Sequence, residues 1–282
     1  MSGTGGSEGG AGMRAFRFGA VVAPDDEVKR WRDTVHRVAD LGYSTVLMPD
    51  GLQLHAPFPS LAVAAEVEPR VRVGTFVLAG PLRQPRMVAW EAHTLSLLSG
   101  GRFDLGLGTG RPAVREWTEA MGLPFGSAEE RLDQLATTVD ELRALDGDQH
   151  TPVLVAASGP KALAVAGARA DAVTLAAGPL ATRAEVAAMA ARVRDAAGER
   201  DVELAMNVFV VGDEVAPWVR DFVGVDAETL IAHDSLYLLR GTTDDMVAEL
   251  QRRRDAFGVS AVSVHWTSME ALAPVVQALT GR

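Results

Sequence analysis

The residues most suggestive of a binding site lie in the stretch 99–112, which reads Ser-Gly-Gly-Arg-Phe-Asp-Leu-Gly-Leu-Gly-Thr-Gly-Arg-Pro. A turn leads into a short apolar strand, and that strand ends at Gly108, Thr109 and Gly110. Glycines at the carboxyl end of a strand let a flat ligand, or another part of the chain, come close to the backbone. Ligands of α/β folds bind at that edge. We therefore predict a ligand contact at Gly108, Thr109 and Gly110, with Arg111 directly after them as a candidate anion-binding side chain.

A second loop combines an expected helix start with polar groups. Residues Ala157, Ser158, Gly159, Pro160 and Lys161 follow an expected strand and open an expected helix. Free backbone amides and the helix dipole at such a start attract anions, and a hydroxyl and an ammonium group stand beside them. The loop therefore predicts a cradle for phosphate or carboxylate. The alternative interpretation, in which Ser158 only caps the helix, has equal weight from the sequence alone.

Three side chains near expected strand ends could transfer protons, namely Asp50, His55 and His265. Asp50 could instead cap its loop, and His265 could be a hydrogen-bonded core histidine. Metal chemistry is not expected, because no histidines stand at H-x-H or H-x-x-x-H spacing and the chain has no cysteine. A G-x-S-x-G nucleophile elbow is also absent from the sequence. This pattern favours chemistry carried by an organic cofactor.

The elements that must position these residues alternate between strand and helix. Strands are expected at 16–22, 44–48, 71–78, 103–107, 153–156, 172–175, 203–211 and 261–265, and helices at 26–41, 58–67, 85–98, 128–145, 160–168, 181–197 and 269–279. Helical material is also expected after the strand at 203–211, up to about residue 257. Eight such units predict an α/β fold of the (β/α)8 barrel type. A doubly wound sheet is the rival, but it usually carries its glycine-rich turn after the first strand. Residues 216–235 are irregular and are expected to form an insertion before the last strand.

Composition narrows the class of protein. The chain has 282 residues, a net charge of −10 and 48% hydrophobic residues, which is typical of a globular protein. A nucleic-acid partner is not expected, because no basic face stands out. Residues 1–13 are expected to be a Gly/Ser-rich tail without the pattern of a signal peptide, and 14–282 to form one domain. No apolar run approaches membrane-spanning length, so we expect a soluble cytoplasmic protein.

The chain resembles the luciferase-like flavin and deazaflavin oxidoreductases of the bacterial luciferase superfamily from about residue 16 to its end. The motifs that carry the resemblance are 98–110, read Leu-Ser-Gly-Gly-Arg-Phe-Asp-Leu-Gly-Leu-Gly-Thr-Gly, and 156–163, read Ala-Ala-Ser-Gly-Pro-Lys-Ala-Leu, supported by 73–78, 83–85 and 262–266. The resemblance implies a TIM barrel with a flavin-type cofactor at its mouth. Coenzyme F420 is the first choice of cofactor and FMN the alternative. The implied activity is hydride transfer between reduced deazaflavin and a small organic substrate.

The resemblance also implies positions for the cofactor. A non-prolyl cis peptide near Phe76–Val77, together with Ala79, would support the ring from behind. The phosphate loop would be 157–161, and Ala177 and Gly178 would touch the cofactor tail. A homodimer is implied as well.

The chain departs from the family pattern in two places. Many relatives have Asp-His where this chain has Asp50-Gly51, and some deazaflavin members have glutamate where Arg111 stands. The acid–base residue therefore stays open among Asp50, His55 and His265. The alternatives to the deazaflavin enzyme are an FMN-dependent monooxygenase and a cofactor-binding barrel without turnover.

Overall fold

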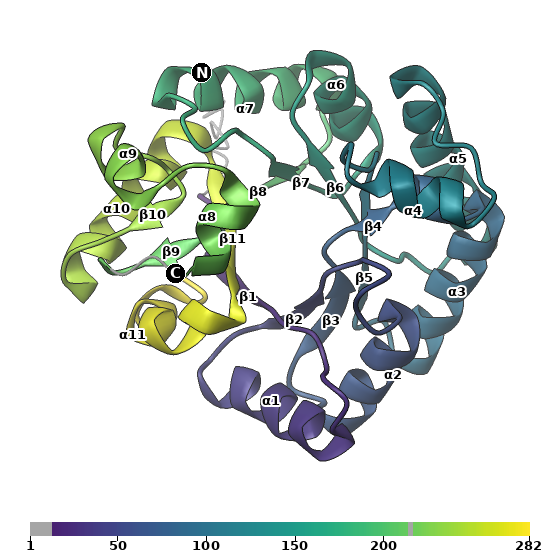
Figure 1. The fold of residues 1–282 in the computed structure, drawn as a ribbon, viewed down its shortest axis with the longest axis horizontal. Helices are drawn as coiled ribbons and strands as arrows, with labels where there is room; N and C mark the ends of the chain where they lie inside the picture. Colours follow the sequence, from purple (N-terminus) through teal and green to yellow (C-terminus); the bar gives the residue numbers. More distant parts are fainter. Residues whose placement is uncertain (1–12, 214–216) are drawn as a thin grey trace, which may run out of the picture.

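The computed structural model describes residues 13–213 and 217–282, and within them parallel strands close into a barrel surrounded by helices (Figure 1). The barrel strands are β1 (Arg17–Val21), β2 (Thr45–Met48), β3 (Arg72–Thr75), β4 (Leu78–Ala79), β5 (Phe103–Gly108), β6 (Val153–Ala157), β7 (Ala172–Leu175), β8 (Glu203–Val208) and β11 (Val259–His265). β3 and β4 follow one another along the same side of β5, so together they fill one position of an eight-membered barrel. The predicted (β/α)8 fold is confirmed.

The outer helices connect successive strands and cover the barrel. They are α1 (Val28–Asp40), α2 (Pro57–Val67), α3 (Pro85–Leu98), α5 (Ala128–Asp146), α6 (Pro160–Arg169), α7 (Arg183–Ala197), α10 (Thr243–Phe257) and α11 (Met269–Leu279). Local sequence sets several of their starts: α2, α3 and α6 begin with proline. Capping boxes at Ser127 and Thr182 open α5 and α7. Apolar side chains on the outward faces of the strands, such as Phe18, Phe103 and Leu105, pack against these helices as the main core.

The predicted strands and helices match the structure within a few residues, with three differences. The expected strand 71–78 is divided into β3 and β4, and the expected strand 203–211 ends at β8 and is followed by the separate β9 (Val210–Val211). The short helix α4 (Val114–Ala120) was not predicted from the sequence. The predicted tail lies outside the described residues apart from Met13, so it stays a prediction.

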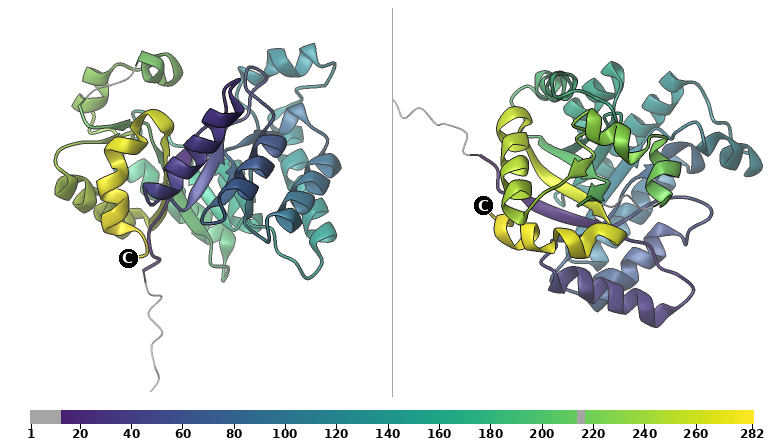
Figure 2. Two further views of the ribbon diagram at one scale, coloured as in Figure 1. Left: turned by 90° about the horizontal axis from the view of Figure 1, so that it is seen from below. Right: turned by 60° about the vertical axis from the view of Figure 1, so that its left-hand side comes forward.

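The expected insertion before the last strand forms a small unit of its own. It contains β9, α8 (Pro217–Val223), α9 (Ala227–Ala232) and β10 (Leu238–Leu239), and β9 pairs in parallel with β10 outside the barrel. A separate apolar cluster that includes Val219 and Leu230 holds it together. The helices of the insertion and α4 lie at the end of the barrel opposite the carboxyl terminus (Figure 2). They therefore frame the end where the strands finish, which we call the mouth.

Ion pairs cross the amino end of the barrel interior. Arg17 Nε donates to Glu203 at 2.7 Å, and Arg72 binds the carboxylate of Asp104 at 2.5 Å. Arg17 also lies 3.6 Å from Asp104, which joins the two pairs. The four side chains come from β1, β3, β5 and β8, and we call them the charge plug. They satisfy each other's charge and leave the carboxyl end of the interior for other side chains.

Two glycines of the 99–112 stretch face the break between β3 and β4. The structure has a cis peptide between Phe76 and Val77, as expected from the family resemblance. The hydroxyl of Thr75 donates to the carbonyl of Gly106 and accepts from its amide, both at 2.8 Å. A Cβ on Gly106 would lie 1.9 Å from the carbonyl oxygen of Thr75, and one on Gly108 would lie 2.8 Å from Val77 Cγ2. It is therefore another part of the chain that approaches these two glycines.

We predict that Gly106→Ala lowers the free energy of unfolding by about 3 kcal/mol, because the added methyl group overlaps backbone that cannot move independently of β3. Urea unfolding followed by circular dichroism measures the change. Gly178→Ala is the matched control, since a Cβ there meets nothing within 4 Å. Equal stability of the two variants would contradict the assigned close approach.

Candidate active site

The loops that contain the predicted ligand contacts meet at the mouth. Strands β4, β5, β6 and β7 pair in that order, so the loops that follow β5, β6 and β7 lie next to one another. The structure thereby brings together Gly108–Arg111, Ala157–Lys161 and Ala177–Gly178. His265 ends β11 farther around the barrel. His55 lies apart from them, exposed, with Nε2 3.3 Å from the carboxylate of Asp26.

Asp50 is buried and forms an ion pair that the sequence did not reveal. Its carboxylate accepts from both terminal nitrogens of Arg83, at 2.5 and 2.8 Å, and from the backbone amide of Ala79 at 2.9 Å. Only 3% of the Asp50 side chain is exposed. The carboxylate therefore positions β4 and the turn after it, and its role in proton transfer stays a prediction. Arg83 belongs to the motif 83–85, which is the feature of the sequence that marks this partner.

Helix α5 fixes the same rim from outside the barrel. Gln134 Nε2 donates to the carbonyl oxygens of Gly80 and Arg83, at 2.9 and 2.7 Å. Arg131 Nε donates to the carbonyl of Thr109 at 2.9 Å. Two side chains on successive turns of one helix thus hold the loops that follow β4 and β5, and neither was predicted from the sequence.

Arg111 lies against aromatic side chains of the insertion. Its guanidinium carbon is 4.2 Å from the ring centre of Phe222. Phe209 stacks on Tyr237 with ring centres 4.3 Å apart and contacts Phe222 at 5.7 Å. The Tyr237 hydroxyl donates to the carbonyl of Ala177 at 2.7 Å, and burial raises the pKa of Tyr237 while the positive charge of Arg111 opposes that change. We call Phe209, Phe222 and Tyr237 the rim aromatics; they join the insertion to the loops after β5 and β7.

The guanidinium of Arg111 keeps its hydrogen-bonding edge available. Among residues 13–213 and 217–282, no carboxylate lies within ion-pair distance of it. A guanidinium that stacks on an aromatic ring still presents in-plane N–H donors that fit a carboxylate or phosphate. Arg111 therefore has the geometry of an anion-binding side chain at the mouth.

The loop at 157–161 is largely exposed to solvent, and no side chain caps the helix that follows it. Gly159 is the N-cap of α6 and no side chain caps the helix, so the capping role considered for Ser158 is not found. Ser158, Gly159, Pro160 and Lys161 are exposed, whereas Ala157 is buried. Lys161 Nζ is 3.7 Å from Glu129, and both side chains are largely in solvent. Such an exposed pair contributes little to stability, which leaves the ammonium group able to turn toward a ligand.

The ring-support residues predicted from the resemblance lie between β3 and β5. Phe76 lines a cavity of about 30 Å³ inside the barrel, a volume that suits one water molecule. Phe76 and Val77 are half-buried, and Ala79 is buried beside Asp50. They form a largely apolar surface next to Gly108.

His265 is the most perturbed titratable group at the mouth. Burial lowers its pKa to about 4, because desolvation disfavours the charged imidazolium. Its Nδ1 lies 2.9 Å from the hydroxyl of Thr267. At neutral pH the ring is therefore neutral and can accept a proton or exchange hydrogen bonds.

Three polar side chains on the inner face of the barrel escaped the sequence analysis. They are Thr174 on β7, Asn207 on β8 and Ser263 on β11, and the Ser263 hydroxyl donates to Asn207 Oδ1 at 3.0 Å. The inner face could be assigned only when the register of the strands was known. Together with His265 they place hydrogen-bonding groups below the mouth.

Comparison with known proteins identifies the family. The family model described as luciferase-like monooxygenase matches residues 13–223, which is well over half of the chain. The chain therefore belongs to the luciferase-like monooxygenase family, and the resemblance noted from its motifs is confirmed.

Curated relatives in this family include F420-dependent enzymes and a monooxygenase. F420-dependent glucose-6-phosphate dehydrogenase of Intrasporangium calvum is 32% identical over 170 residues, which cover 49% of this chain and 51% of that protein. 4-Hydroxyprotoasukamycin monooxygenase of Streptomyces nodosus subsp. asukaensis is 33% identical over 111 residues, 35% of this chain and 30% of that protein. The chain thus matches about half the length of the dehydrogenase.

Solved structures share the fold. The coenzyme F420-dependent tetrahydromethanopterin reductase of Methanopyrus kandleri has a TM-score of 0.73 at 18% identity, over 94% of this chain and 99% of that one. An F420-dependent secondary alcohol dehydrogenase has a TM-score of 0.76 at 16% identity, over the same shares. At these identities the likeness is one of fold. No helix in the described part of the chain is long and apolar enough to span a membrane.

We predict that His265 makes stability depend on pH in the acid range. The pKa of His265 is near 6.5 in the unfolded chain, whereas in the folded protein it is about 4. The unfolded state therefore binds more protons between these values, and stability is lost as the pH falls through them. Melting temperatures measured across this range should fall less steeply for His265→Asn than for the wild type. Parallel curves would show that His265 titrates normally.

Proposed function

We propose that this protein is an F420-dependent oxidoreductase that moves a hydride between the deazaflavin and a small organic substrate. The observation that carries the proposal is the rim over β5, β6 and β7, where Arg111 and Lys161 stand above loops with little side-chain bulk. The half-length matches to F420-dependent dehydrogenases support this choice over FMN.

The rim fits the anionic side chain of such a cofactor. A Cβ on Gly159 or Gly178 would meet nothing within 4 Å, so both loops leave room for a phosphate against the backbone. The amides that begin α6 and the dipole of that helix favour negative charge. Arg111 and Lys161 would add charge-assisted hydrogen bonds from two sides. The tail would therefore lie along Ala157–Lys161 and Ala177–Gly178 with Arg111 above it.

The inner edge of the rim fits a flat ring. Val77 fills the space that a side chain on Gly108 would need, and the surface formed by Phe76, Val77 and Ala79 would support one face of the ring. The cofactor, when bound, supplies the hydride acceptor or donor. The protein holds the ring, orients the substrate on its open face and handles the proton.

We assign the proton-handling role first to His265, because its neutral imidazole lies at the end of β11 on the inner face of the barrel. Asp50 would act by holding β4 and Ala79 in position through its ion pair with Arg83. His55 is the remaining candidate, and its exposed position beside Asp26 suits contact with a substrate at the outer rim.

Titration of the purified protein with oxidised F420 tests the proposal. We expect saturable binding, followed by the change in cofactor absorbance or fluorescence, and weaker binding of FMN. Arg111→Leu should weaken F420 binding about tenfold, and Lys161→Ala should weaken it by roughly 1–3 kcal/mol, since each removes a charge-assisted hydrogen bond.

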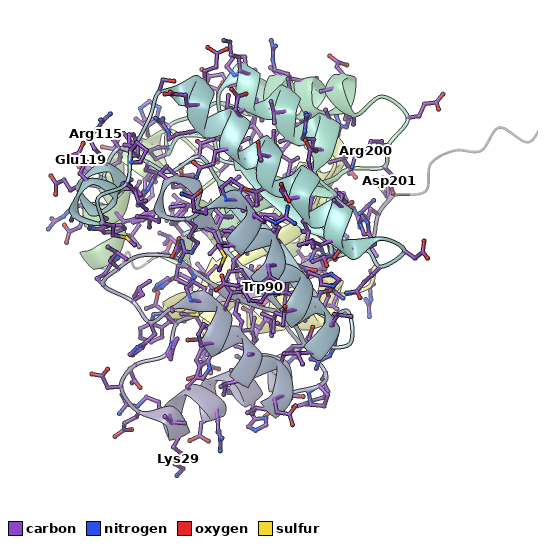
Figure 3. The ribbon with its side chains drawn as sticks, turned by 90° about the vertical axis from the view of Figure 1, so that its right-hand side faces the viewer. Lys29, Trp90, Arg115, Glu119, Arg200 and Asp201 are labelled. Carbon is purple, nitrogen blue, oxygen red and sulfur yellow. The ribbon has the colours of Figure 1, made fainter. Side chains whose placement is uncertain are left out.

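The matched control is Arg115→Leu. Arg115 also stacks on an aromatic ring, 4.5 Å from the centre of Phe125, but it lies on α4 at the outer surface (Figure 3). It should bind F420 as the wild type does. Tighter binding of FMN would favour the FMN-dependent monooxygenase, and no binding of either cofactor would favour a barrel without turnover.

We also propose that the protein is a homodimer formed through α3. Four large apolar side chains on this helix are 48–76% exposed, namely Met87, Trp90, Leu97 and Leu98. Trp90 lies on the outer surface of the helical ring (Figure 3). Clustered apolar side chains of this size on a surface commonly mark a protein interface.

Trp90→Glu should convert a dimer into a monomer, because it places a charge in the apolar contact. Light scattering coupled to size-exclusion chromatography measures the mass in solution. Ile231→Glu, which changes an exposed apolar residue of α9, should leave the dimer intact. A monomeric wild-type protein would refute the proposed contact.

A further inference from the structure

The inner face of the barrel below the mouth has a polar side on β7, β8 and β11. The register of these strands pairs Thr174 with Ala205 and Asn207 with Ser263. Paired residues of adjacent parallel strands point to the same face, and Ala205 and Ser263 both line the interior cavity. Thr174, Asn207 and Ser263 therefore share the inner face, and we call them the inner wall.

The hydroxyl of Thr174 is buried without a hydrogen-bond partner in the described part of the chain. The residue is 4% exposed, and its Oγ1 has no hydrogen-bond partner in the described part of the chain. A buried polar group without a partner costs free energy in the folded protein, so such groups are rare and often belong to functional sites. A ligand atom that reaches Thr174 would recover this cost.

Asn207 contributes donors that point to the same space. Its Oδ1 accepts from Ser263, an arrangement that fixes the orientation of the amide. No hydrogen bond from Nδ2 to an acceptor is found within the described ranges, and the residue is only half-buried. The Ser263 hydroxyl thus holds Asn207 with its N–H groups available from the mouth.

The inner wall itself contains no ionised group. Arg17 and Asp104 of the charge plug line the same interior cavity from its amino end, and the charges of the plug neutralise one another. Asp50 is paired with Arg83. The cationic side chains assigned to anion binding, Arg111 and Lys161, lie on the rim outside the wall. An anion on the inner wall would lose its hydration without gaining an unpaired counter-charge, because Arg17 is already paired with Glu203 and Asp104, and such burial is strongly unfavourable.

We propose that the inner wall is the subsite for an uncharged carbonyl or hydroxyl group of the substrate. Asn207 donates to the ligand oxygen, and Thr174 donates to it or accepts from a hydroxyl. The neutral His265 lies two residues beyond Ser263 on β11, at the outer end of the same face. This inference rests on the proposed function, which defines the reaction as hydride transfer. It predicts that the reacting group of the substrate is a ketone, an aldehyde or an alcohol and is neither a carboxylate nor a phosphate.

The carbonyl-rich edge of a deazaflavin ring has similar hydrogen-bonding chemistry, so the experiment must separate cofactor from substrate. The variants are Thr174→Val and Asn207→Leu, which keep side-chain volume and remove hydrogen bonds. Thr174→Ser is the conservative variant that keeps the hydroxyl. Thr138→Val is the control, because Thr138 is a buried threonine on α5 whose hydroxyl binds the carbonyl of Gln134 outside the barrel.

Binding of cyclohexanol and of cyclohexanecarboxylate is measured by saturation-transfer NMR, with and without oxidised F420. We expect the wild type to bind the alcohol in preference to the carboxylate. Thr174→Val and Asn207→Leu should each weaken alcohol binding about tenfold, whereas Thr174→Ser and Thr138→Val should keep it. The F420 dissociation constant should not change. Thr174→Val should melt no lower than the wild type, because the hydroxyl that it removes has no partner.

Three results would overturn the assignment: preference for the carboxylate, unchanged alcohol binding in both wall variants, or no alcohol binding by the wild type. A parallel loss of F420 affinity in the wall variants would assign the wall to the cofactor ring. Failure of the wild type to bind F420 would refute the proposed function alone, since the alcohol measurement without cofactor still tests the wall.

Discussion

The contact between Thr75 and Gly106 is the constraint on which the arrangement of the mouth depends. Two hydrogen bonds and a backbone approach that excludes any side chain join β3 to β5. The chain then turns through Phe76 and Val77 before β4 resumes the pairing with β5. The Asp50–Arg83 ion pair and the two hydrogen bonds donated by the Gln134 side-chain amide hold the far side of this turn. The apolar surface of the mouth is therefore fixed by several independent contacts before any ligand binds, which is the preorganisation that a cofactor site requires.

Charged and neutral polar groups lie at different depths below the mouth. Cationic side chains and helix amides lie on the rim, where solvent moderates the cost of an unpaired charge. Neutral hydrogen-bonding groups lie below them on the inner wall, and ion-paired charges close the amino end. Such a gradient orients a molecule that has an anionic tail and a neutral reactive end. Under the proposed function, it would also let a chain with a net charge of −10 bind an anionic cofactor, since local groups outweigh the overall charge at short range.

The sequence was sufficient for features that depend on local patterns. Alternating strands and helices predicted the barrel, and proline and glycine placed the loops after β5 and β6. Features that depend on distant residues were not predictable, because Asp50 and Arg83 are 33 positions apart and meet only in the folded barrel. The strand expected at 71–78 has β-branched residues at alternate positions up to Val77, and its division reflects packing against Gly106. Thr174 resembles any strand threonine until the register shows which face it occupies and that its hydroxyl has no partner.

Under the proposed function, the charge plug has a consequence for the order in which substrate and product move. The charge plug closes the amino end of the barrel, so the interior is reached from solvent through the mouth. If the inner wall binds the substrate as we propose, a product there would leave by the path through which the substrate entered, past the rim aromatics and past the molecule bound at the rim. Because substrate and product would share this path, the insertion between β8 and β11 would influence the rate of product release. Changes in its length or apolar surface would alter the rate of exchange without altering the reacting groups.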